Sequence, residues 1–343
     1  MDEAQIRDAD HPFSPTSDTE NPSDLILLSM DAVRFYVHWS VLAYASVFFK
    51  DLQTLPAPSG VDADQTFDGK PVVPLTEPAV VVGKLLRLCY PRTSDAFAIA
   101  DLDGIAGAYE AAKKYLILGG TANIEAILVD PRILDAQPHR VYAIAYHHGL
   151  EPIAKKAAMA TLSKLPFDGK QPHPPEYEYI PAVALWRLLA FHQRCVDRLI
   201  HELKQPCYWQ HQSQLQNPTR WVHPSLSAVW WRDEDVRHAQ HCGPRYAEED
   251  VGPAAWFSRH IDAVCDKLAR CADVERITTQ LSRISGETLH AISACPACAR
   301  EAPDQLEVLA RDVKASMKRE LSLELTLSNF LTDESPFFVP LIP

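Results

Sequence analysis

The stretch that decides the fold is SDLILLSMDAVRFYVHWSVLAYASVFFKDL, residues 23–52. It opens with a short apolar run, Leu25–Leu28, which a turn separates from Val33–Val37. In the second run, apolar residues alternate with others, which is the period of a half-buried strand. Two strands joined by a short Asp-containing turn are typical of a β-hairpin. From Val41 to Leu52 the apolar residues recur at helical spacing, so we expect helices directly after the hairpin.

Six residues of this stretch, and three segments after it, follow an order that is typical of one domain family. An acidic residue precedes the first strand, a Phe-x-x-His motif closes the second, and spaced Leu, Ser and Phe residues follow. These residues are Asp24, Phe35, His38, Leu42, Ser46 and Phe49. Downstream, Val72–Leu75 has the pattern of a third strand, and Val80–Tyr90 and Leu102–Leu118 have those of two further helices. The order resembles the BTB/POZ domain, which implies an α+β fold with a small mixed sheet and a helical cluster.

The rest of the chain divides by composition. An acidic N-terminal segment without periodicity cannot bury enough apolar surface to offset its ordering entropy. A proline-rich segment in the middle of the chain forbids regular structure. Long amphipathic patterns on the C-terminal side of it predict a mostly α-helical region. We therefore expect a disordered acidic tail (1–22), a BTB/POZ domain (23–130), a helical extension (131–165), a linker (166–176), a helical C-terminal domain (177–330) and an apolar, proline-rich tail (331–343).

Composition excludes several classes of function. The 343 residues carry a formal charge of −12, and an acidic surface repels phosphate backbones, so we expect no nucleic-acid partner. No apolar run approaches the roughly 20 residues that span a bilayer, and the N-terminus lacks a signal-peptide pattern. Eight cysteines at irregular spacings favour reduced thiols over a disulfide framework. These features predict a soluble, intracellular protein of the cytoplasm or nucleus.

Motifs for catalysis are absent from the sequence. It contains no G-x-S-x-G elbow, no phosphate-cradling G-x-x-x-x-G-K-[ST], no G-x-G-x-x-G and no H-E-x-x-H, which are the common signatures of hydrolases, nucleotide enzymes and zinc proteases. An unrecognised hydrolase in the C-terminal half would rest only on the abundance of histidine there. We therefore expect a protein that is not an enzyme and has no small-molecule substrate.

One cysteine pair has the spacing of a metal site. Cys295 and Cys298 form a C-x-x-C, which lets two thiolates bind one tetrahedral zinc ion. Further candidate ligands come from a segment rich in Trp and His; they are His241 and Cys242 first, and also Cys207, His211 and His238. The alternative is that both cysteines are small, partly buried apolar groups at a helix end. The sequence leaves three interpretations of the pair open: a structural zinc site, redox chemistry and buried apolar packing.

The resemblance implies a function in protein interaction. BTB domains usually dimerise through their first strand and helices, and many serve as adaptors for cullin-type ubiquitin ligases or transcriptional co-regulators. A homodimer of this chain would use residues at the strand edge and the first helix. These residues are Asp24, Leu25, Leu28, Phe35, His38, Trp39, Leu42 and Tyr44.

Two departures from the family pattern narrow this expectation. Trp39 stands where transcription-factor members have a basic residue that pairs with the acidic one. Between Tyr90 and Leu102 there is no apolar-x-Glu signal of the kind used for cullin contact. The arrangement resembles fungal BTB proteins with a helical C-terminal region. It predicts a homo- or hetero-oligomerising adaptor or scaffold, with a zinc-stabilised regulatory protein and a cullin substrate adaptor as alternatives.

Overall fold

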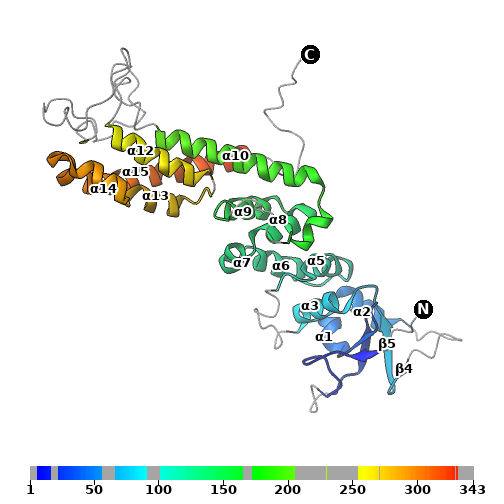
Figure 1. Ribbon diagram of the computed structural model, residues 1–343. Coiled ribbons are helices and arrows are strands. Elements are labelled where there is room, and N and C mark those ends of the chain that lie inside the picture. Colours follow the sequence, from blue (N-terminus) through cyan, green and yellow to red (C-terminus); the bar gives the residue numbers. More distant parts are fainter. Residues whose placement is uncertain are drawn as a thin grey trace, which may run out of the picture. The chain divides into compact units, whose positions relative to one another are not determined.

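The computed structural model describes residues 6–16, 22–55, 66–90, 101–164, 172–204, 229, 254–269, 271–328 and 330 (Figure 1). The chain divides into two compact units, Met1–Ile153 and Ala154–Pro343, and each is described by itself below. The first unit combines a sheet with helices, and the described part of the second is helical. The predicted α+β domain followed by a helical region is therefore confirmed.

The sheet of the first unit has five strands in the order β1-β3-β2-β5-β4. Their bounds are β1 Arg7–Asp8, β2 Leu25–Leu28, β3 Val33–Val37, β4 Thr66–Phe67 and β5 Lys70–Pro74. Strands β2 and β3 pair antiparallel, with Leu25 opposite Val37, and β2 pairs parallel with β5. The predicted hairpin is thus confirmed. The central strand β2 is apolar throughout because it lies between two neighbours in the core.

The hairpin turn also fixes the start of a helix. Ser29 Oγ accepts a hydrogen bond from the Val33 amide (3.0 Å) and donates one to Asp31 Oδ1 (2.7 Å). The same carboxylate oxygen accepts a bond from the amide of Ala79, the first residue of α3 (2.7 Å). Side chains of Ser and Asp commonly bond to such unpaired amides in turns and at helix starts. The turn therefore holds the sheet and α3 in register.

Helices account for most of the remainder of the first unit (Figure 1). They are α1 Trp39–Ala45, α2 Val47–Thr54, α3 Ala79–Cys89, α5 Ile105–Lys114, α6 Gly120–Leu128, α7 Pro131–Ala136 and α8 Pro138–His147, and α9 Glu151–Thr161 crosses into the second unit. Helices α3 and α5 pack so closely that a Cβ on Gly107 would lie 2.7 Å from Val81 Cγ2. Only glycine allows this approach.

The N-terminal segment differs from the predicted disordered tail. Residues 6–16 follow a defined path, in which β1 pairs parallel with β3 through Arg7 opposite Val33. Phe13 is only 3% exposed, and its ring lies 6.3 Å from that of Phe35 and 5.4 Å from that of Tyr90. One buried aromatic ring and one strand pairing order a segment whose composition is otherwise that of a tail.

The second unit is a set of packed helices. Their bounds are η2 Pro175–Tyr179, α10 Ala182–Lys204, α12 Ala255–Leu268, α13 Val274–Ser282, α14 Gly286–Ser293 and α15 Pro296–Leu327. Helix α15 packs against α10, α13 and α14, and so forms the centre of this unit. The predicted linker (166–176) falls inside this unit, which begins at Ala154, and its last two residues belong to η2, which begins at Pro175. The other division points predicted from composition remain predictions.

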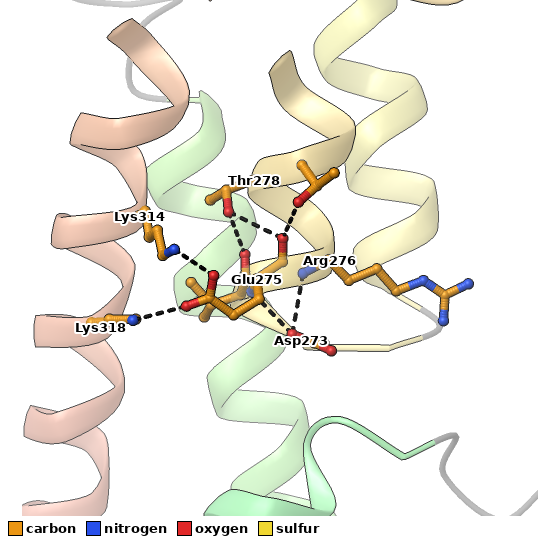
Figure 2. Close-up of polar contacts among 8 residues, drawn as sticks. Asp273, Glu275, Arg276, Thr278, Lys314 and Lys318 are labelled. Carbon is orange, nitrogen blue, oxygen red and sulfur yellow. Dashed lines mark hydrogen bonds and ion pairs between the residues drawn. The ribbon is translucent and has the colours of Figure 1, made fainter. Parts of the chain in front are cut away.

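Two carboxylates of the second unit contrast in their burial. Glu275, on the surface of α13, forms ion pairs with Lys314 and, at 2.9 Å, with Lys318, both on α15 (Figure 2). Glu324 is 5% exposed and accepts a hydrogen bond from Arg194 of α10. Exposed pairs contribute little to stability, whereas a buried carboxylate depends on its partner. Loss of the Arg194–Glu324 pair between α10 and α15 is therefore expected to destabilise this unit more than loss of the Glu275 pairs.

Candidate docking surface

Five exposed apolar side chains gather on two neighbouring segments of the first unit. Two of them are aromatic and three are aliphatic, and we call them the outer patch. They are Tyr44 (87% exposed), Val47 (43%), Phe48 (37%), Leu116 (55%) and Leu118 (65%). Scattered single apolar residues are normal on a protein surface, but a cluster is typical of an interaction site.

Backbone contacts hold the two segments of the outer patch together. The amide of Leu118 donates to the carbonyl of Ala45 (2.8 Å), and Ser46 forms an isolated antiparallel bridge with Ile117. The buried hydroxyl of Ser46 donates to the carbonyl of Tyr115 (2.6 Å) and accepts from the amide of Phe49 at the start of α2 (3.1 Å). The junction of α1 and α2 is thus fixed against the turn that follows α5.

The buried ring of Tyr115 packs against the aromatic residues at the start of α2. Its ring lies 5.2 Å from that of Phe48 and 5.5 Å from that of Phe49. Its hydroxyl donates to Glu77 Oε2 (2.6 Å), and Lys114 binds the other oxygen of Glu77 (2.8 Å). Burial disfavours the charged form of Glu77, but these hydrogen bonds outweigh it and lower the pKa of the carboxyl. The charged carboxylate of Glu77, held by these two hydrogen bonds, therefore anchors the aromatic ring that packs against the outer patch.

Leu116 has an unusual backbone conformation. Its φ is +49°, in the left-handed region, where an L-residue other than Gly, Asn or Asp is uncommon. Glycine would fit this turn more easily, yet the chain carries a leucine whose side chain is 55% exposed. Unfavourable backbone conformations of this kind concentrate at functional sites. Neither the turn nor the core thus accounts for a leucine at position 116.

The predicted interaction residues fall into two groups. Leu25, Phe35 and Leu42 are core residues, exposed by 0%, 5% and 0%, and their side chains face the interior of the domain. Tyr44 and Asp24 are exposed, and the remaining three are partly buried; these three are Leu28, His38 and Trp39. The prediction that they contact a partner remains a prediction, and the structure restricts it to those that solvent can reach.

Asp24 and His38 have structural contacts within the domain. Asp24 Oδ1 accepts a hydrogen bond from the amide of Trp39, at the start of α1 (2.7 Å), as a capping carboxylate does. The amide of His38 donates to the hydroxyl of Tyr90 (2.7 Å), and its Nδ1 lies 3.2 Å from the same oxygen. Burial raises the pKa of the Tyr90 hydroxyl, which stays protonated. These contacts join α1, β2 and α3.

The candidate zinc ligands are divided between described and undescribed parts of the chain. Cys295 and Cys298 are both buried, at 2% and 0% exposure, around the first turn of α15. His241 and Cys242, with the other three candidates, lie outside the described residues. Within the described ranges, no three His, Cys, Asp or Glu side chains gather closely enough to hold a metal ion. A zinc site remains a prediction, which elemental analysis of the protein and of a Cys295→Ser variant would test.

Sequence reasoning found Tyr44 but missed the other four members of the outer patch. A signal exists in hindsight, because the run Leu116-Ile117-Leu118 alternates outward and inward, as a bridged segment does. Ile117 is 7% exposed, whereas both leucines point into solvent. Without the Ser46 bridge, the same run reads as the apolar end of a helix.

Comparison with known proteins agrees with this architecture. Residues 13–130 match the family model of the BTB/POZ domain, and this range begins at Phe13, the buried aromatic residue of the N-terminal segment. No curated protein and no solved structure matches the chain. No helix in the described ranges has the length and apolar character needed to cross a membrane. The sheet, its helical cluster and the family match together identify residues 13–130 of this chain as a BTB/POZ domain.

Proposed function

We propose that this chain is a non-enzymatic scaffold whose BTB/POZ domain joins two copies of the chain through the outer patch. BTB/POZ domains are protein-interaction modules, so the family match supports a protein partner. The single observation that carries the proposal is the outer patch itself, whose members range from 37% to 87% exposed. The use of the dimer as an adaptor for further proteins is part of the same proposal.

The composition of the outer patch suits an interface. Tyr and Phe are enriched at interface centres, because they bury a large area and lose few rotamers on binding. Tyr44 is the most exposed of the five, and its hydroxyl can remain hydrated at the rim. In a two-fold dimer the same patch is contributed twice, so the two copies supply ten apolar side chains. A second copy therefore gives these side chains a complementary apolar surface.

The patch also has a polar border. Lys50 and Asp51 on α2 and Lys113 and Lys114 at the end of α5 are exposed. An apolar centre with a charged rim is the usual anatomy of a protein interface. We place the protein inside the cell, in the cytoplasm or nucleus; in support, no disulfide joins the cysteines of the described ranges.

The oligomeric state of the full chain tests this proposal. Light scattering after size exclusion is expected to give twice the 38.4 kDa chain mass. Tyr44→Asp places a charge within the patch and is expected to yield a folded monomer, because an unpaired charge opposes burial. Tyr179→Asp is the matched control, since Tyr179 is also exposed (60%) but lies in the second unit. A monomeric parent chain, or a Tyr44→Asp variant that keeps the doubled mass, would refute the proposal.

A further inference from the structure

A second exposed apolar surface lies on helix α10. Val183, Trp186 and Leu189 are 43%, 69% and 38% exposed, and we call them the α10 outer face. Their spacing of three places them on neighbouring turns. The buried residues of this helix follow a different stripe, formed by Ala184, Leu188, Phe191, Cys195, Leu199 and Leu203. An exposed tryptophan with two apolar neighbours is a surface that a protein commonly covers.

The end of α15 leads the chain toward this face. Arg194 Nη2 donates to Ser328 Oγ (2.9 Å). Two residues later, Arg187 Nη1 donates to the carbonyl of Phe330 (2.9 Å), and the ring of Phe330 lies 5.3 Å from that of Phe191. Between residues 328 and 330 the contact has thus moved about two turns toward the N-terminus of α10. Arg187 lies between Trp186 and Leu189 along α10, so at Phe330 the chain has reached the turns that carry the α10 outer face.

The chain beyond Phe330 has the composition to cover an apolar surface. Residues 331–343 read LTDESPFFVPLIP, and the last eight hold five large apolar residues and three prolines. Proline restricts φ, so an extended proline-rich segment loses less conformational freedom when it docks. From Phe330 to Phe337 the chain can span up to about 25 Å, whereas Arg187 and Val183 are only about 6 Å apart along the helix. The segment reaches the face easily.

We propose that residues 336–343 dock on the α10 outer face of their own chain, with Phe337 and Phe338 packed against Trp186. A tethered segment is present at an effective concentration in the millimolar range, and this segment follows directly on Phe330, which already contacts α10 of its own chain. Phe330 itself lies against the turns of α10 that carry this face. The occupant is therefore the chain's own C-terminal segment, and the docked state withholds Trp186 from other partners.

Hydroxyl-radical footprinting of the full chain, read by mass spectrometry, tests this docking. Trp186 is expected to be labelled slowly in the parent chain and several-fold faster in a Phe337→Asp/Phe338→Asp variant. Tyr44, in the other unit, serves as an internal reference whose labelling does not change between the two proteins. Thr332→Asp is the matched control, because it adds charge to the same tail outside the apolar segment, and it is expected to label as the parent chain does.

Two results would overturn the proposal. Equally fast labelling of Trp186 in the parent chain and in the Phe337→Asp/Phe338→Asp variant would show that the face is bare. Protection of Trp186 that survives in the variant but disappears on dilution would show that a second copy covers the face instead. Circular dichroism of both proteins checks that the helices are intact, so that faster labelling reports release of the tail and not unfolding.

Discussion

Replacing Leu116 by glycine separates the stability of the BTB/POZ domain from its self-association. The left-handed backbone of Leu116, with φ at +49°, costs an L-residue about 1–2 kcal/mol. Glycine removes that cost but adds roughly 0.5–1 kcal/mol of chain entropy. It also loses the partial burial of a side chain that is 55% exposed, worth about 1 kcal/mol. These terms nearly cancel, so the free energy of unfolding of the monomer is expected to change by less than about 1 kcal/mol.

Association responds differently to the same substitution. Burying the exposed half of a leucine contributes about 0.8–1.5 kcal/mol, and a two-fold interface counts it twice. The dissociation constant is therefore expected to rise roughly 10- to 100-fold, since about 1.4 kcal/mol corresponds to a factor of ten. Sedimentation velocity over a range of concentrations measures this constant, and urea unfolding of dilute protein measures stability.

Met30→Gly provides the control for this experiment. Met30 is 69% exposed in the hairpin turn and lies outside the outer patch, so its loss should leave the dissociation constant unchanged. A Leu116→Gly variant that folds normally and associates as tightly as the parent chain would refute the assignment of the patch as the interface.

Three further predictions concern charged groups. The lowered pKa of Glu77 means that its stabilisation is present above the ordinary pKa of 4.5 and is lost as pH falls. In a Glu77→Gln variant, the free energy of unfolding should therefore fall less between neutral pH and pH below 4.5, as urea unfolding at both pH values would measure. Arg194→Met leaves the buried Glu324 carboxylate poorly paired and should destabilise the second unit by about 2 kcal/mol; a Tm equal to that of the parent chain would contradict this. Glu275→Gln should leave Tm unchanged, because its ion pairs with α15 lie at the surface; a marked fall would show that the surface pairs matter.

Local pattern determined much of the fold in advance. Alternation in Val33–Val37 and the apolar run Leu25–Leu28 predict the observed hairpin, because each strand side that faces a core must be apolar. Helices α3 and α10 were predictable for the same reason, because their apolar residues recur at helical spacing. Strand β1 could not be predicted, because two residues carry no period and the order of this segment depends on contacts of Phe13 with Phe35 and Tyr90, which are distant in the sequence.

The candidate site was harder to predict, because exposure is a tertiary property. An apolar residue in a strand or helix reads the same whether it faces the core or a partner. Leu25, Phe35 and Leu42 were expected at an interface and lie in the core instead. Leu116 and Leu118 face outward only because Ile117 bridges Ser46, some 70 residues earlier in the chain. No local pattern reports such a contact.

A site-specific cross-link tests the central claim most directly. With p-benzoylphenylalanine in place of Tyr44, irradiation of the full chain is expected to give a product of twice the 38.4 kDa chain mass. Mass spectrometry of that product should join position 44 of one copy to residues 44–48 or 116–118 of the other. Cross-links confined to a single chain, or a dimer joined through other residues, would contradict the outer patch as the surface through which this BTB/POZ domain associates.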